Sequence, residues 1–198
     1  SWIPKRANYD LLNNYRNGYL KALNASTRHV ALLYESTIAL PMSGSRIDFL
    51  SQSVKSSLRK DFKEMARFLL EVKNESQARI FTLDSRPVVF SFGTHTWGLF
   101  LGSFRQRSAI RDLVRDVREI FRDTYGEYPY LVGEEFVLST KGTLGTDRLF
   151  RMANFDAIYV YHHASNLKPG IQATLPITDP YIQNQRNILA RAYSTVGQ

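Results

Sequence analysis

The sequence predicts an α/β fold in which short parallel strands alternate with covering helices, as in a (β/α) barrel of the TIM type. Short apolar runs alternate with longer segments whose apolar residues recur every three or four positions. Polar and aromatic residues directly follow each run, and no glycine-rich nucleotide-binding turn is present. Barrel enzymes build their sites from several strand ends, whereas a doubly wound sheet gathers its ligand at one crevice. The pattern therefore favours the barrel.

Length and composition indicate a single domain spanning residues 1–198. The 198 residues are 43% hydrophobic and 22% charged, enough for one sizeable core and too few for two domains of ordinary size. No apolar stretch approaches the roughly 18 residues that a membrane-spanning helix needs, so no membrane partner is expected. The absence of cysteine excludes disulfides, thiolate-bound zinc and a cysteine nucleophile. The first ten residues lack the features of a secretory signal, so the compartment stays open.

The net charge of +8 raises nucleic acid as an alternative partner. The densest basic run extends from Arg105 to Arg122, but its arginines alternate with acidic residues at helical spacing. That pattern is typical of a solvated helix face with many ion pairs. It favours a surface helix over a phosphate-binding stripe and argues against nucleic acid as the partner.

The first half of the chain predicts two helices and one strand. Residues Tyr9–Leu23 carry an apolar stripe of helical spacing that Gly18 only weakens. The run His29–Tyr34 is short and continuously apolar, as expected for a strand buried on both faces, and it ends at Glu35. The clearest helix is Val54–Val72, whose apolar residues fall three and four apart with charges between them.

The second half continues the alternation. After residues 74–86, which include a short extended segment near 80–83, the apolar run Pro87–Phe92 predicts a strand. The further expected elements are a helix carrying Ile110–Phe121 that stops at Tyr125-Gly126, strands at Tyr130–Val132 and Phe155–Tyr161, and a helix at Asp179–Tyr193.

Residues at the ends of the predicted strands, or just past them, form the candidate site. They are Glu35, His95, Trp97, Glu134, Tyr161 and His162. Carboxylates could do acid and base work on a sugar while aromatic rings stack on it, so a glycan is the expected ligand. Trp97 and Tyr161 could equally be core residues, and of the neighbours Glu134 and Glu135 at most one faces the site. Adjacent histidines diverge and no matching carboxylate motif is near, so neither a metal nor another cofactor is expected.

Four segments resemble consecutive strand blocks of the endo-α-mannosidase-like glycoside hydrolases of family 99. They are Leu33-Tyr34-Glu35-Ser36, Asp84-Ser85-Arg86-Pro87-Val88-Val89-Phe90, Tyr128-Pro129-Tyr130-Leu131-Val132-Gly133-Glu134 and Phe155-Asp156-Ala157-Ile158-Tyr159-Val160-Tyr161. Their order and intervals match that family from about Tyr9 onward. The resemblance implies a (β/α)₈ barrel that acts on α-mannosidic or related glycans without a metal.

One departure from the family limits what the resemblance implies. The glutamate-rich motif with tryptophan and histidine that carries the family's catalytic carboxylates after a late strand is absent from this sequence. A complete barrel has eight strands in about 250 residues, whereas this chain predicts about four to five. We therefore expect an incomplete barrel, a fragment of a longer one, with the catalytic pair outside this chain. The six site residues would bind substrate, and no catalytic residue is assigned.

The expected function is a glycoside hydrolase-like domain that acts on or binds α-linked, mannan-type glycans. With the full barrel present, it would be a retaining glycosidase. A non-catalytic carbohydrate-binding or scaffold barrel is the first alternative, and a basic nucleic-acid-binding domain is the second. The sequence defines neither the linkage nor the oligomeric state.

Overall fold

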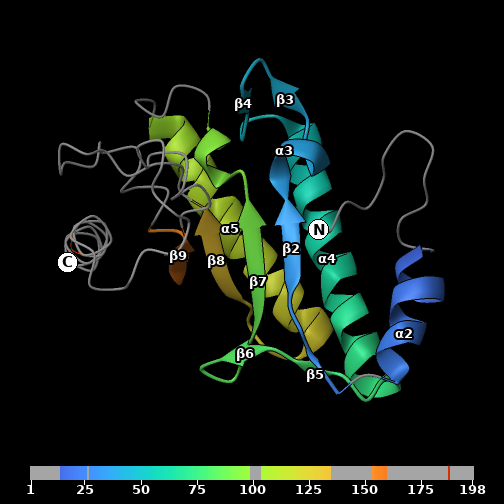
Figure 1. Ribbon diagram of the computed structural model, residues 1–198. Helices are drawn as coiled ribbons and strands as arrows, with labels where there is room; N and C mark the ends of the chain where they lie inside the picture. The colour runs from blue at the N-terminus through green and yellow to red at the C-terminus, as the bar shows by residue number, and fades with distance from the viewer. Residues whose placement is uncertain (1–13, 26, 99–103, 135–152, 160–186, 188–198) are drawn as a thin grey trace, which may run out of the picture.

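A parallel sheet with helices on one face forms the centre of the molecule (Figure 1). The computed structural model describes residues 14–25, 27–98, 104–134, 153–159 and Asn187. Within these, the sheet order is β2-β7-β8-β9, with neighbouring strands parallel. The strands are β2 (Leu32–Glu35), β7 (Arg86–Phe92), β8 (Tyr130–Glu134) and β9 (Ala157–Tyr159). The predicted parallel α/β arrangement is confirmed for this part of the chain.

Two long helices connect the first three of these strands and pack against each other behind the sheet (Figure 1). α4 (Gln52–Glu75) follows β2, and α5 (Phe104–Tyr125) follows β7. The apolar stripe predicted for α4 is buried against the sheet: Val54, Leu58, Phe62, Met65, Leu69 and Val72 are each at most 1% exposed. Helical periodicity therefore identified both the helix and the face that it buries.

Smaller elements surround this core. The N-terminal helical segment is divided into η1 (Tyr15–Leu20), a π-helix, and α2 (Lys21–Asn24); the part of the predicted helix before Asn14 lies outside the described residues. The remaining elements are β1 (His29–Val30), α3 (Ser36–Ala39), β3 (Met42–Ser43), β4 (Arg46–Ile47), β5 (Arg79–Ile80), β6 (Thr82–Leu83) and η2 (Thr94–Thr96). Asn187 is helical, and the rest of the helix predicted at Asp179–Tyr193 is outside the described residues.

The single strand predicted over His29–Tyr34 is divided into two. β1 pairs with β5 in a separate parallel sheet, whereas β2 pairs with β7. β6 pairs antiparallel with the start of β7 through a two-residue turn in which Asp84 and Ser85 have φ angles of 49° and 61°. Positive φ at both central positions is typical of a type I′ hairpin, which fits the twist of the flanking strands.

One face of the sheet packs against the helices, and the other is turned away from them. Because successive residues of a strand point to opposite faces, one placed residue in each strand shows on which face the others lie. Leu32, Tyr34, Val89 and Leu131 belong to the hydrophobic core shared with α4 and α5. Gly133 also points to that side, where a Cβ atom would lie 2.6 Å from the Phe155 ring. The residues between these, such as Leu33, Phe90 and Val132, therefore lie on the other side, which we call the opposite face.

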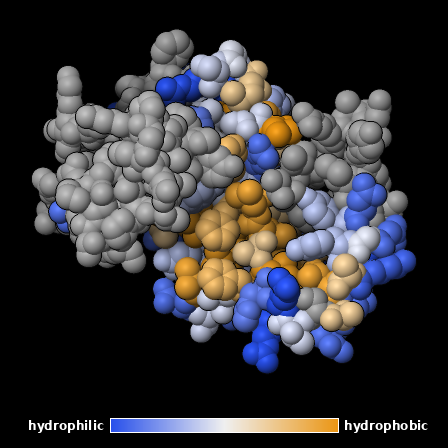
Figure 2. All heavy atoms as spheres, viewed as in Figure 1, coloured by the Kyte–Doolittle hydropathy of each residue, from blue (hydrophilic) through white to orange (hydrophobic). Residues whose placement is uncertain are grey.

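The opposite face is largely apolar. Phe90 and Tyr159 make an edge-to-face ring contact there at 5.9 Å between centroids, and both are partly exposed. Figure 2, viewed as in Figure 1, shows an apolar patch on the side turned away from the long helices. A contiguous apolar surface over a sheet indicates a place where something else packs or binds.

Asp156 binds several elements together at the end of the sheet where β7 and β8 begin. Its carboxylate accepts hydrogen bonds from Arg86 Nη1 at 3.0 Å and from the Leu131 amide at 2.8 Å, and Arg118 Nη1 lies 2.8 Å away. These partners hold the pKa of Asp156 below its ordinary value against the opposing effect of burial. Arg86 also stacks over the Tyr130 ring at 4.7 Å. One carboxylate therefore connects β7, β8, α5 and the entry to β9.

Replacing Asp156 with Asn should lower the free energy of unfolding by about 2 kcal/mol at pH 7, because two partly buried guanidinium groups lose their charge partner. The loss should shrink as the pH falls through the lowered pKa of Asp156, where the wild-type carboxylate also becomes neutral. Chemical denaturation at pH 7 and pH 3 measures both quantities. D112N is the matched control, because the ion-pair partners of Asp112 in the described part of the chain, Arg111 and Arg115, are both exposed. A loss for D156N no larger than that for D112N would contradict the assignment.

Candidate functional site

Four side chains form a row where the parallel strands end, on the opposite face. The register pairs Glu35 with Phe92 and Glu134 with Tyr159. Because Ser91 pairs with Gly133, the next residues along, Phe92 and Glu134, are also neighbours. We call Glu35, Phe92, Glu134 and Tyr159 the edge row. Carboxylate and aromatic side chains alternate along it across four adjacent strands.

Both glutamates face the same side of the sheet. Tyr34 points into the helical core, where its hydroxyl contacts Asp61, so the next residue, Glu35, points to the opposite face. Gly133 packs against Phe155 on the helical side, so Glu134 also points to the opposite face. The two strands that carry them are separated by β7. Two strand spacings of the usual size put their backbones about 10 Å from each other. The structure therefore places Glu35 and Glu134 on one face, at the same edge of the sheet.

The segment after β7 holds the Glu134 side chain in place. The Gly93 amide donates a hydrogen bond to Oε2 of Glu134 at 2.5 Å, and His95 Nδ1 lies 3.5 Å from the same oxygen. The Thr94 hydroxyl donates to the main-chain carbonyl of Glu134. The Glu134 side chain is 0% exposed, and its Oε1 atom has no hydrogen-bond partner among the described residues. Within the described residues, one carboxylate oxygen is therefore fixed and the other has no donor.

Gly93 makes this arrangement possible. Its φ angle of +77° lies in the left-handed region, and a Cβ atom would lie 2.4 Å from Thr37 Cγ2. The hydroxyl of the neighbouring Ser36 donates to the Phe92 carbonyl at 2.5 Å. Only glycine can turn the chain this closely against α3 while aiming its amide at Glu134.

Trp97 lies in the core rather than in the edge row. It is 2% exposed, and its ring contacts Phe49 at 5.0 Å and Phe155 at 5.3 Å between centroids. Of the two interpretations of Trp97, packing is therefore the one that the structure supports. Its place in the predicted substrate-binding set is corrected, because a ring enclosed by two others has no face left for a sugar.

The other predicted site residues fall into two groups. His95 is near Glu134, as described above, and is partly exposed. Tyr161 and His162 lie outside the described residues, so the structure does not place them. The sequence analysis missed Phe92 and Tyr159, although Phe92 is the last residue of its predicted strand and Tyr159 lies two residues before Tyr161, on the same face of the strand.

A second buried carboxylate lies between the sheet and α4. Asp61 is 4% exposed, and the Tyr34 hydroxyl donates to its Oδ2 atom at 2.9 Å. Burial raises the pKa of Asp61 to about 7, although the hydrogen bond from Tyr34 opposes the shift. Burial likewise raises the pKa of Tyr34 well above its ordinary value. This pair is on the helical side of the sheet and is not part of the edge row.

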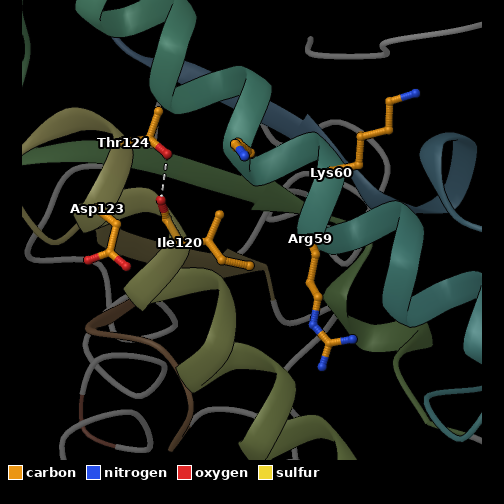
Figure 3. Close-up of a pocket in the computed structure, with 6 residues that line it drawn as sticks. Arg59, Lys60, Ile120, Asp123 and Thr124 are labelled. Atoms are coloured by element: carbon orange, nitrogen blue, oxygen red, sulfur yellow. Dashed lines mark hydrogen bonds between the residues drawn. The ribbon is translucent and has the colours of Figure 1, made fainter.

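A surface groove of about 380 Å³ lies between α4 and α5. Its lining residues are Arg59, Lys60, Lys63, Ile120, Asp123 and Thr124. All of them except Lys63 are labelled in Figure 3. Arg59 is ion-paired with Asp116 at 2.6 Å, and Asp123 is ion-paired with Arg122 at 2.7 Å. The groove is on the helical side of the molecule and does not join the edge row.

The arginine-rich run forms the ion-paired helix face that the sequence predicts. On α5, arginine side chains lie within 4.0 Å of acidic groups along the length of the helix. Arg115 pairs with Asp112, Arg118 with Asp156 and Arg122 with Glu119. The pairs made by Arg115 and Arg122 agree with the interpretation of this run as a solvated face, whereas Arg118 is only 20% exposed and pairs with Asp156 at the sheet.

A membrane-spanning helix and a metal centre are two further possibilities for the described part of the chain. None of its helices is both long enough and apolar enough to cross a membrane. None of its histidine and acidic residues gather in a group of three that could hold a metal ion. Comparison of the chain with protein-family models, curated proteins and solved structures found no match to any of them.

Proposed function

We propose that this chain forms part of a (β/α)-barrel domain of the glycoside hydrolase type and binds an α-linked glycan along the edge row. The observation that carries the proposal is the alternation of carboxylate and aromatic side chains where four parallel strands end. Enzymes with this fold place their sites at that edge. The resemblance to family 99 of the glycoside hydrolases supplies the substrate class, α-mannosidic glycans.

The strand order supports the barrel. Strands β2, β7, β8 and β9 follow one another in space as they do in the chain, without reversal, and α4 and α5 lie together on one face. A doubly wound sheet reverses its order at a switch point and carries helices on both faces. The apolar side chains opposite the helices would then face the interior of the barrel, which further strands would close.

The chemistry of the edge row suits a sugar. A pyranose presents hydroxyl donors around its ring and apolar C–H groups on its faces. Carboxylates such as Glu35 and Glu134 accept hydrogen bonds from the hydroxyls, and rings such as Phe92 and Tyr159 offer flat apolar surface. Because the family's glutamate-rich catalytic motif is absent, these 198 residues should bind glycan without hydrolysing it. In a complete barrel, hydrolysis would retain the anomeric configuration.

Binding should be measured by isothermal titration calorimetry with α-linked mannan and glucan oligosaccharides. Wild-type protein is expected to bind at least one of them, and F92A should weaken binding about tenfold through loss of a stacking surface. Y19A is the matched control, because Tyr19 is an aromatic residue on η1 that is 46% exposed. The absence of binding to every oligosaccharide would contradict the proposal. Release of reducing sugar by the isolated chain would contradict the expectation of binding without hydrolysis.

A further inference from the structure

The unsatisfied oxygen of Glu134 points to a direct role for this residue. A buried polar atom without a partner costs about 1–3 kcal/mol, and more when its group is charged. Native proteins therefore seldom leave such atoms, and those that remain call for an explanation in function. Glu134 Oε1 is buried and has no hydrogen-bond partner among the described residues, whereas Oε2 of the same carboxylate accepts a hydrogen bond from the Gly93 amide.

The surroundings of Glu134 fix its orientation. The Gly93 amide and His95 Nδ1 contact one oxygen, and Thr94 anchors the backbone of Glu134 itself. All three come from the short segment that follows β7, which is braced in turn by the bond from the Thr96 hydroxyl to the Gly93 carbonyl at 2.7 Å. A carboxylate held on one side only is preorganised to accept a donor on the other.

We infer that Glu134 Oε1 accepts a hydrogen bond from the ligand, and that the ligand is a neutral sugar rather than an anionic one. The inference rests on the proposed function and deepens it by naming a contact atom and a charge preference. Two glutamates lie in the edge row, so a phosphate, sulfate or uronate group there would face repulsion. The site would discriminate against anionic glycans even though the whole chain carries a net charge of +8.

The test compares E134Q with wild type. Glutamine keeps the shape of the side chain, and its carbonyl oxygen can still accept from the Gly93 amide, but its NH₂ group places a donor where Oε1 was an acceptor. Affinity for methyl α-mannopyranoside, measured by NMR titration, is expected to fall at least tenfold in E134Q, with no loss of thermal stability. Wild type should bind the corresponding mannuronide, methyl α-mannopyranosiduronate, at least tenfold more weakly. E119Q, a change at a half-exposed position on α5, serves as the control for removal of one negative charge.

A second probe separates this inference from the proposed function. Methylammonium carries hydrogen-bond donors but is no sugar, and it should shift the resonances of His95 in wild type and not in E134Q. If methylammonium behaves so while no sugar binds, the role of Glu134 Oε1 as an acceptor stands, and both the preference for a neutral sugar and the glycan function are wrong. Equal mannoside affinity in wild type and E134Q would overturn the inference and leave the function standing. Failure of wild type to bind either probe would overturn both.

Discussion

Raising the pH from 5 to 8 is expected to lower the contribution of Asp61 to the free energy of unfolding by about 2–3 kcal/mol. The folded-state pKa of Asp61 is about 7, well above its ordinary value of 3.8. Between these two pKa values the folded protein binds more protons than the unfolded chain, so stability falls as the pH rises. The loss should be nearly complete at pH 8, where Asp61 is ionised in both states.

The variant D61N isolates this effect. Asparagine can still accept the hydrogen bond from the Tyr34 hydroxyl but cannot ionise, so D61N should be more stable than wild type at pH 8 and have similar stability at pH 5. Urea denaturation at several pH values gives the difference between the two proteins, which removes the contributions of other groups. The hydrogen bond from Tyr34 lowers the pKa of Asp61. In Y34F this pKa should therefore be higher, and the decrease in the free energy of unfolding should continue to higher pH than in wild type. A wild-type minus D61N difference that does not change with pH would contradict this account.

Replacing Gly93 with Ala should destabilise the protein by about 2–4 kcal/mol, combining a strained backbone with an overpacked contact. Alanine at a φ of +77° is strained, and its Cβ would lie 2.4 Å from Thr37 Cγ2. The segment must shift to relieve that clash, which moves the amide away from Glu134. Ligand affinity should therefore fall together with stability.

G44A separates the two contributions to this loss. Gly44 also has a positive φ of +61°, but nothing lies within 4 Å of the position that a Cβ would take. G44A should cost only about 1 kcal/mol, the backbone strain alone. Thermal denaturation of G93A, G44A and wild type compares them directly. Equal losses in G93A and G44A would show that the close approach to Thr37 contributes nothing.

The parts of the fold that the sequence predicted are those in which periodicity is strong. α4, α5 and β7 appear where apolar spacing indicated, because long amphipathic stripes and continuous apolar runs reflect burial directly. Two features were beyond this reasoning. The predicted strand is divided into β1 and β2 because its first part pairs with β5 and its second part with β7. The strands of the β3–β4 hairpin are too short to show an alternation of apolar and polar residues.

The candidate site could be predicted in part for a related reason. Glu35 and Glu134 follow apolar strands, so their common edge follows from parallel strand direction alone. The burial of Trp97 could not be predicted, because it depends on Phe49 and Phe155, which are distant in sequence. The Tyr34–Asp61 pair was missed for the same reason: a charged residue within an apolar helix stripe shows its partner only in three dimensions.

Disulfide trapping tests the central claim, that the edge row lies along one face of parallel strands. The chain has no cysteine, so an introduced pair can react only with itself. Register neighbours on one face of adjacent strands lie within the roughly 4–7 Å Cα separation that a disulfide spans. The pairs E35C/F92C and F92C/E134C should each form an intramolecular disulfide on mild oxidation. The pair E35C/S91C should not, because Ser91 pairs with Tyr34 and points to the helical side. Failure of both edge-row pairs to form, or equal formation by the control pair, would contradict the arrangement on which the proposed site depends.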